Sequence, residues 1–241
     1  MAEPLLTLEG VHTHIGEYHI LQGVDFTVEE GGLTVLMGRN GAGKTTTLRT
    51  IMGLWRASRG RITFAGQSIE TRATPDIARL GLAYVPESMG VFADLSVREN
   101  MLLAARDAPL DMARMEWIFS FFPALKTFWT HPAGVLSGGQ KQMVSIARAI
   151  LEPRRLILID EPTKGLAPAI IEAMIAAFLE LKRERTTILL VEQNFRFASS
   201  LGDRVVVMDD GRIVHADTMA RLAADEAAQT RLLGLSLAAH Q

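Results

Sequence analysis

The sequence predicts an α/β fold: a mixed β-sheet core with an antiparallel β region at its N-terminal end and a helical subdomain. Three observations predict it: alternating short runs near the N-terminus, apolar runs that alternate with helical patterns, and a long helical stretch in the middle of the chain. Strand–helix–strand alternation indicates a sheet with right-handed crossovers. With 241 residues, 48% of them hydrophobic, the chain is long enough to bury such a core.

The first part of the chain predicts strands followed by a single helix. Residues 5–30 alternate apolar and polar side chains in short runs separated by glycines, which is typical of antiparallel strands. The apolar run Leu33–Met37 predicts a buried strand, and a glycine-rich turn leads from it to a helix expected over 44–52. Another buried strand is expected at Leu82–Val85, where Pro86 ends it.

The middle of the chain predicts a helical lobe at about residues 88–136. Helical patterns cover 97–106 and 112–121, and a further helix is expected over 139–151. Six aromatic residues fall in the lobe, and we expect them to form its small core; a surface that docks a membrane partner is the alternative. These residues are Trp117, Phe119, Phe121, Phe122, Phe128 and Trp129.

The C-terminal half returns to the strand–helix–strand pattern. The apolar runs 156–159 and 187–191 predict buried parallel strands, with a helix expected over 170–185 between them. Further along, Asp210-Gly211 lies between two short apolar runs and predicts a two-residue hairpin.

Charge and composition exclude several classes of function. The formal net charge of −2 gives no electrostatic footprint for nucleic acid, so no nucleic-acid partner is expected. Without cysteine there is no disulfide framework, thiolate metal site or cysteine nucleophile. The best candidate for a membrane span, residues 169–181, is interrupted by Glu172 and Glu180. Work at a membrane would therefore require partners that hold the chain there.

The segment Gly38–Thr45 matches the pattern G-x-x-x-x-G-K-[ST] of a phosphate-binding loop. Its glycines let the backbone aim N–H groups at phosphate oxygens, Lys44 supplies a point charge to the β and γ phosphates, and the Thr45 hydroxyl binds Mg²⁺. The alternative is a glycine-rich turn that binds nothing, but the position between a strand and a helix N-terminus favours phosphate. The residues expected to bind the phosphates are Gly38, Arg39, Asn40, Gly41, Ala42, Gly43, Lys44, Thr45 and Thr46.

Two acids, Asp160 and Glu161, follow the apolar run 156–159. Because the C-terminal ends of strands in such a sheet face the ligand crevice, Asp160 is expected to hold Mg²⁺, directly or through water. Glu161 is expected to polarise the attacking water as a general base. Alone, two acids more simply end a strand; beside a phosphate loop the catalytic interpretation is favoured.

A third motif, Leu136-Ser137-Gly138-Gly139-Gln140, precedes the helix expected over 139–151. A hydroxyl and two glycines at a helix N-terminus can form a second anion site, although the isolated string would more often be an ordinary capped helix start. The chain thus holds two phosphate-binding elements for one nucleotide. That makes sense if each completes a site across a dimer.

The phosphate loop, the third motif and the acid pair stand in the order and approximate spacing of the ATP-binding cassette family, which the whole chain resembles. The resemblance implies a P-loop NTPase-type core in one nucleotide-binding domain over residues 1–241, and a head-to-tail pair of such domains. ATP and Mg²⁺ would lie between the Lys44 loop of one domain and Ser137, Gly138, Gly139 and Gln140 of the other. It also implies transmembrane permease subunits as partners and a peripheral position at the cytoplasmic face of the membrane.

Finer motifs resemble the shorter ATPase subunit of branched-chain amino acid importers, although importers of urea or amides use similar subunits. The resemblance implies an extracytoplasmic solute-binding protein as an indirect partner. It favours a related ATPase as the other half of the dimer, with a second copy of this chain as the alternative. The finer motifs lie at residues 84–87, 94–100, 165–168 and 191–194.

Three positions depart from the family pattern. Glu87 stands where most members have a glutamine that senses the γ-phosphate; an acid can bind magnesium or accept a hydrogen bond from water but has no amide to donate. Gln193 stands where most have histidine, and its amide can bind a γ-phosphate without carrying a proton. The resemblance still implies catalytic roles for both. Ile15 takes the place of the aromatic residue that stacks on adenine, with Tyr18 nearby, so the adenine contact stays open.

Two other kinds of cassette protein are alternatives to an importer subunit. DNA-acting members place a long coiled coil between the phosphate loop and the third motif, whereas only about ninety residues separate Thr45 from Leu136 here. Ribosome-acting members usually carry two cassettes in one chain. An exporter's ATPase subunit differs only in the finer motifs, and its partners would distinguish it.

Overall fold

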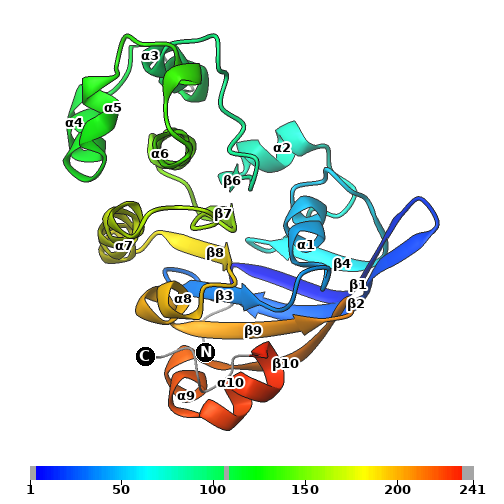
Figure 1. The fold of residues 1–241 in the computed structure, drawn as a ribbon. Helices are drawn as coiled ribbons and strands as arrows, with labels where there is room; N and C mark the ends of the chain where they lie inside the picture. The colour runs from blue at the N-terminus through cyan, green and yellow to red at the C-terminus, as the bar shows by residue number, and fades with distance from the viewer. Residues whose placement is uncertain (1–3, 106–108, 235–241) are drawn as a thin grey trace.

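The computed structural model describes residues 4–105 and 109–234 of the chain. Two β-sheets and a group of helices make up the fold, with the helices of the middle segment gathered at one end (Figure 1). One sheet is antiparallel and the other mostly parallel, so the predicted α/β class is confirmed. The end of the helix expected over 97–106, at Arg106, lies outside the described residues.

The antiparallel sheet contains the N-terminal strands in the order β2-β1-β4-β5. β1 and β2 confirm the strands predicted for residues 5–30, and the tight turn between them brings Ile15 opposite Tyr18. β4 and β5 were not predicted, because most of β4 is polar and exposed and only its end alternates into the core. The strands are β1 (Leu6–Ile15), β2 (Tyr18–Val28), β4 (Ala57–Phe64) and β5 (Gln67–Ser68).

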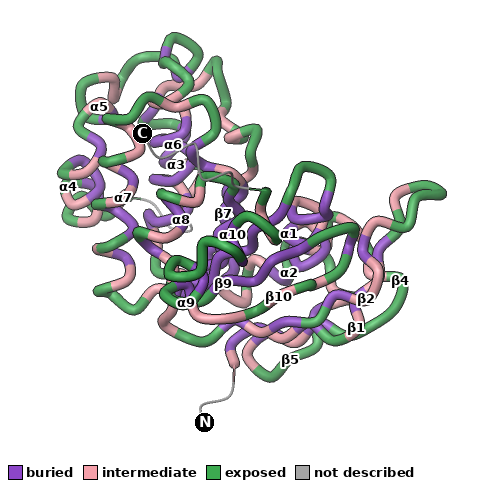
Figure 2. The backbone as a smooth tube through the Cα atoms, turned by 60° about the horizontal axis from the view of Figure 1, so that its bottom comes forward, coloured by how far each residue is buried: buried purple, intermediate pink, exposed green. Residues whose placement is uncertain are grey.

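The second sheet has the strand order β10-β9-β3-β8-β7-β6 and is parallel except for β10. Every residue of β3, β7 and β8 is buried, and Figure 2 shows the buried backbone running through the middle of the molecule. Strands covered on both faces lose the alternating pattern, which is why they read as continuous apolar runs. These strands are β3 (Leu33–Met37), β6 (Leu82–Val85), β7 (Leu156–Asp160), β8 (Thr187–Val191), β9 (Arg204–Asp209) and β10 (Arg212–Thr218).

The predicted hairpin joins β9 to β10 at Asp210 and Gly211, both with positive φ (41° and 72°). Two consecutive left-handed residues match the twist of the strands they connect. A Cβ on Gly211 would lie 2.1 Å from the carbonyl oxygen of Ile20, so this position requires glycine. The hairpin thereby packs against β2.

Helices cover both faces of the parallel sheet and extend beyond it. The structure confirms four predicted helices, those expected over 44–52, 112–121, 139–151 and 170–185. Their observed ends differ from the predicted ones by at most two residues, which is the usual uncertainty of a helix boundary. The helices are α1 (Lys44–Ile51), α2 (Thr74–Arg79), α3 (Val97–Ala104), α4 (Met112–Phe121), α5 (Pro123–Thr127), α6 (Gly138–Ile150), α7 (Pro168–Arg183), α8 (Phe195–Leu201), α9 (Met219–Ala224) and α10 (Glu226–Leu233), with a 3₁₀ turn at Ala133–Val135.

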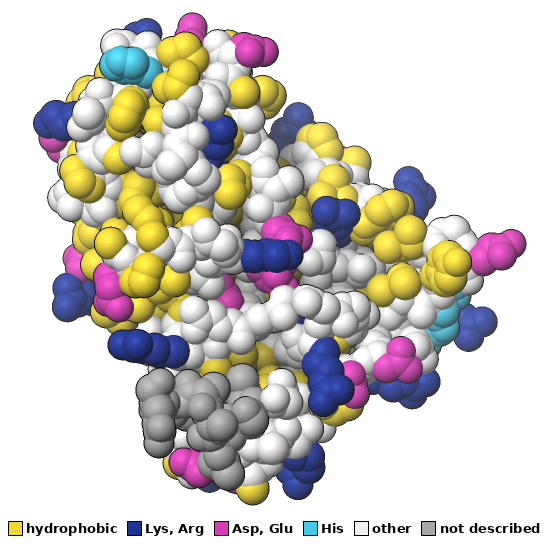
Figure 3. All heavy atoms as spheres, in the orientation of Figure 1, with side chains coloured by type: hydrophobic (Ala, Val, Ile, Leu, Met, Phe, Trp, Pro, Cys, Tyr) yellow, Lys and Arg dark blue, Asp and Glu magenta, His cyan; other side chains and the backbone are white. Residues whose placement is uncertain are grey.

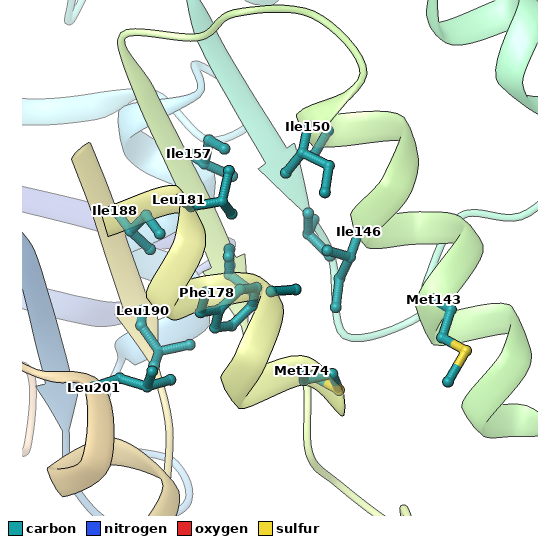
Figure 4. Packing of buried hydrophobic residues seen from close by; sticks show 14 of the residues in the cluster. Met143, Ile146, Ile150, Ile157, Met174, Phe178, Leu181, Ile188, Leu190 and Leu201 are labelled. Carbon is teal, nitrogen blue, oxygen red and sulfur yellow. The ribbon is translucent and has the colours of Figure 1, made fainter. Parts of the chain in front are cut away.

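Alternate residues of the central strands enter two different cores. In β7, Ile157 and Ile159 face the core under α6 and α7, whereas Leu156 and Leu158 face the core shared with the antiparallel sheet. Figure 4 shows Phe178 of α7 between the strands and α6. The parallel sheet is thus packed against a hydrophobic core on each of its faces.

The aromatic residues of the middle segment belong to the large core under α6 and α7, so the separate small core expected of them is not what the structure shows. Phe119 and Phe122 are buried in this core, and the other four pack against it while partly exposed. Trp117 meets Phe121, and Phe119 meets Trp129, in edge-to-face contacts. The limits of a separate lobe at about 88 and 136 stay a prediction. None of the helices described here is long and apolar enough to cross a membrane.

Candidate functional site

The carboxyl ends of four parallel strands carry the candidate residues. β3 leads into the phosphate loop at Gly38, β6 into Glu87, β7 ends at Asp160, and Gln193 comes two residues after β8. In the sheet β8 lies between β3 and β7, and β6 lies beyond β7. Parallel strands direct these ends to the same edge of the sheet, so residues far apart in sequence meet there.

The conformation of the phosphate loop requires its glycines. Gly38 has φ 146°, and a Cβ there would lie 2.1 Å from the carbonyl oxygen of Met208 in β9. Gly43 has φ 106° and packs against Leu21. The loop is therefore clamped between β9 and the antiparallel sheet.

A cavity of about 340 Å³ opens over this loop. α1 begins at Lys44, and the N–H groups of a first helical turn have no partner within the helix, so they are available to an anion. In the space-filling view, acidic and basic side chains lie next to each other in the hollow between the helical end and the sheets (Figure 3). The cavity is lined by Ile20, Asn40, Gly41, Gly43, Lys44, Thr45, Thr46, Glu87, Glu161 and Lys164.

Lys44 is a buried cation held over its own loop. Its side chain is 4% exposed, and Nζ donates hydrogen bonds to the carbonyl oxygens of Gly38 (2.9 Å) and Arg39 (3.1 Å). The same Nζ lies 3.4 Å from Oε1 of Glu161, a side chain that is 10% exposed. The phosphate loop and the end of β7 are thus joined by an ion pair with little solvent around it.

Thr45 and Asp160 supply oxygen ligands side by side. The Thr45 hydroxyl donates to Oδ1 of Asp160 (3.1 Å), and the Tyr84 hydroxyl donates to Oδ2 (3.3 Å). Burial, and to a smaller extent the charge of Glu161, raises the pKa of Asp160, although the bond from Thr45 opposes this. Burial and the neighbouring Asp160 raise the pKa of Tyr84 to about 12.

The Thr45 hydroxyl and the Asp160 carboxylate fit a magnesium ion that also binds the phosphates of a ligand. Among the described residues no three histidine, cysteine or acidic side chains form a metal cage. Mg²⁺ prefers hard oxygen ligands and usually takes only one or two carboxylates, with waters and phosphate oxygens completing the octahedron. The Thr45 hydroxyl and the Asp160 carboxylate supply that kind of partial ligand set.

Gln193 links Glu161, which directly follows β7, to the phosphate loop. Its Nε2 donates to Oδ1 of Asn40 (2.7 Å) and to Oε1 of Glu161 (2.5 Å). Glu161 has φ 44°, a conformation that costs energy in a residue other than glycine, and its N–H donates to the carbonyl oxygen of Val191 (2.9 Å). The backbone thereby turns the Glu161 side chain into the cavity instead of along the strand.

Glu87 reaches the cavity in an ion pair. Lys164 Nζ donates to its Oε1 at 2.6 Å and lies 3.9 Å from Oε2 of Glu161. The structure therefore brings Glu87, Asp160, Glu161 and Gln193 to one place, as their positions after parallel strands predict.

Two sets of predicted residues lie apart from this cavity. Ser137 caps α6: its hydroxyl accepts from the Gln140 N–H, and the Gln140 side chain accepts from the Ser137 N–H. In the described part of the chain, no residue of this motif lines the cavity, and Ser137 and Gly138 are exposed. Ile15 lies at the tip of the β1–β2 hairpin, whereas Ile20 is the residue of that hairpin in the lining.

The sequence interpretation gave no role to four residues of the site: Ile20, Tyr84, Lys164 and Glu192. Glu192 is 2% exposed, and its carboxylate accepts hydrogen bonds from the Thr163 hydroxyl and from three N–H groups. The three N–H groups belong to Thr163, Gln193 and Asn194. An acid directly after a mostly apolar strand is the signal in the sequence by which it could have been found. Burial raises its pKa, which the four hydrogen bonds oppose.

Comparison with known proteins places the sequence among ATP-binding subunits of transporters. Residues 21–164 match the ABC transporter family. The chain is 37% identical to the high-affinity branched-chain amino acid transport ATP-binding protein BraG of Pseudomonas aeruginosa, over 95% of this chain and 100% of the relative. It is 33% identical to the probable branched-chain amino acid transport ATP-binding protein LivF of Archaeoglobus fulgidus, over 91% and 94%.

Solved structures share the fold over nearly the whole length. The structure of an ATP-binding cassette of an ABC transporter in its ADP conformation superposes with a TM-score of 0.80 at 26% identity, over 97% of this chain and 100% of the other. The comparison of folds and the comparison of sequences therefore identify the same family of proteins.

Replacing Glu192 by glutamine tests whether its hydrogen bonds to Thr163, Gln193 and Asn194 stabilise the fold. A glutamine offers only one carbonyl oxygen, so its NH₂ group would face two donors. We expect Glu192→Gln to lower the free energy of unfolding by about 1–3 kcal/mol, the usual cost of unsatisfied buried groups. Urea denaturation measures it, with the exposed Glu116→Gln as the matched control. Equal stabilities for the two variants would contradict this role.

Proposed function

Because this chain belongs to the ABC transporter family, whose ATP-binding domains are ATPases, we propose that it hydrolyses ATP in the cavity over Gly38–Thr46 to power a membrane importer. One observation carries the choice of site. The Glu161 carboxylate is turned into this cavity, 3.4 Å from Lys44 and hydrogen-bonded by Gln193. A base held beside a phosphate-binding lysine is what hydrolysis of a phosphoanhydride requires.

The loop residues bind and orient the nucleotide. The N–H groups at the start of α1 donate hydrogen bonds to the phosphate oxygens, and Lys44 supplies its charge to the β and γ phosphates. Thr45 and Asp160 would hold Mg²⁺, with Glu87 close to them. When bound, the metal neutralises charge that develops on the phosphate oxygens.

Glu161 and Gln193 act on the attacking water. Glu161 polarises the water and takes its proton while the γ-phosphoryl group is transferred. The Gln193 amide positions Glu161 by a hydrogen bond, and a hydrogen bond to the γ-phosphate would replace one of its two present ones. The amide itself transfers no proton. Its second hydrogen bond, to Asn40, couples this position to the phosphate loop.

The exposed start of α6 completes the site of a second subunit. Ser137 and Gly138 are exposed and lie outside this chain's own cavity lining. A head-to-tail dimer would place Ser137–Gln140 of each subunit on the nucleotide of the other. The partner is proposed to be a related ATPase, as in the subfamily that the sequence resembles.

The relatives suggest the cargo and the membrane partners. BraG and LivF carry branched-chain amino acid transport in their names. We infer for this chain a peripheral position at the cytoplasmic face of the membrane, on permease subunits that take up branched-chain amino acids or related small solutes from a solute-binding protein. Residues 88–136 are proposed to form a lobe inserted in the single nucleotide-binding domain, and adenine is proposed to lie near Ile15 and Ile20.

Replacing Glu161 by glutamine separates binding from chemistry. Because the amide cannot take a proton, we expect Glu161→Gln to slow phosphate release by about a hundredfold or more. ATP binding, measured by calorimetry, should persist, and the ATP-bound dimer should accumulate in gel filtration.

The matched variants define what would contradict this assignment. Glu116→Gln, an exposed surface glutamate in the helical segment, should hydrolyse ATP like the unmodified protein. Adding Ser137→Arg to Glu161→Gln should leave nucleotide binding intact and abolish the dimer. Near-normal turnover in Glu161→Gln would exclude it as the base, and a persistent dimer in the double variant would exclude the shared site.

The importer assignment is tested by the proteins that accompany the chain. A tagged chain purified from its own membranes should bring permease subunits and a related ATPase with it, and these membranes should take up labelled leucine in an ATP-dependent way. Co-purification with ribosomes, or with an export permease, would contradict import.

A further inference from the structure

We propose that Lys164 strengthens nucleotide binding at this site by neutralising the charge of Glu87. The phosphates of the nucleotide then meet a cavity whose lining carries equal numbers of positive and negative charges. The inference rests on the proposed ATP site and adds to it a positioning residue. Lys164 would act through Glu87 and Glu161, and its effect would fall on the affinity for the γ-phosphate.

The contacts of Lys164 join two strand ends. The residue lies on the loop between β7 and α7, and its Nζ donates to Glu87 after β6 at 2.6 Å. The same Nζ lies 3.9 Å from Oε2 of Glu161. Lys164 thus stands between the carboxylate after β6 and the proposed base after β7, on the side of Glu161 away from Lys44, which faces Oε1.

The charges in the lining show what its removal would do. Among the described residues that line the cavity, the charged ones are Lys44, Lys164, Glu87 and Glu161, two cations and two anions. Without Lys164, two carboxylates would face one lysine at a place where phosphates must enter. Nearby like charges raise the free energy of a bound anion, and they do so more strongly where walls exclude water.

Position, not exposure, distinguishes this ion pair from an ordinary surface pair. Lys164 and Glu87 are 62% and 42% exposed, close to the 61% and 56% of Lys126 and Glu116 on the helical end. An exposed pair contributes little to stability, so both should be nearly neutral for folding. Of these two exposed pairs, the Lys164 pair lines the cavity and the Lys126 pair does not, which makes Lys126 a matched control.

The experiment measures dissociation constants for ATP and ADP by calorimetry, without Mg²⁺, on the unmodified protein and on Lys164→Met and Lys126→Met. We expect Lys164→Met to weaken ATP binding about three- to tenfold, the scale of a partly screened charge contact. ADP, which lacks the γ-phosphate nearest Glu161, should weaken less. Lys126→Met should change neither constant.

A double-mutant cycle with Glu87→Gln isolates the compensation. If Lys164 acts by neutralising Glu87, the loss in Lys164→Met should disappear in the double variant Glu87→Gln/Lys164→Met, because the uncompensated carboxylate is gone. Lys164→Arg, which keeps the charge, should bind ATP within about twofold of the unmodified protein.

Two outcomes would overturn the inference: unchanged ATP affinity in Lys164→Met, or a loss that Glu87→Gln does not relieve. Neither touches the proposed function, provided that the unmodified protein binds and hydrolyses Mg-ATP with its permease. Failure of the unmodified protein to do so would instead refute the function itself. Thermal melting of each variant separates a binding effect from misfolding.

Discussion

The hydrogen bonds of Gln193 hold the two halves of the site together. One amide group donates both to Asn40 in the phosphate loop and to Glu161 at the end of β7. This is possible because β8 lies between β3 and β7, so that the residues after Val191 emerge between the loop and the acids. The order of strands in a sheet packed on both faces therefore decides which side chains share the cavity.

The buried carboxylates of this site are stabilised in two ways, by an ion pair or by hydrogen bonds. Lys44 and Glu161 face each other almost out of solvent, Asp160 is buried against two hydroxyl groups, and Glu192 is satisfied by four donors beneath the surface. Burial raises the pKa of both Asp160 and Glu192, and their hydrogen bonds oppose it. A bound phosphate would enter a site whose donors and acceptors are already held in position, which reduces the reorganisation that catalysis requires.

Much of the fold follows from the sequence, and the reasons for the exceptions are physical. β3, β7 and β8 are predicted because strands buried on both faces consist mostly of apolar residues. The Asp210-Gly211 hairpin is predicted because two left-handed residues are needed there. β4 was missed because its first half is polar. The phosphate loop and the acid pair can be recognised in the sequence because each is a motif of consecutive residues. The sequence does not reveal that Tyr84, Lys164 and Ile20 belong to the site. Their positions depend on which strands are neighbours in the sheets and on where a loop turns.

The cavity over Gly38–Thr46 is proposed to bind ATP through its phosphates, with Lys44 as the cation. Calorimetry of Mg-ATP binding to the unmodified protein and to Lys44→Ala tests it most directly. The structure predicts binding to the unmodified protein and a dissociation constant at least about tenfold higher in Lys44→Ala, since a charge-assisted contact contributes roughly 1.5–3 kcal/mol. Equal dissociation constants for the two proteins would contradict the assignment of this cavity.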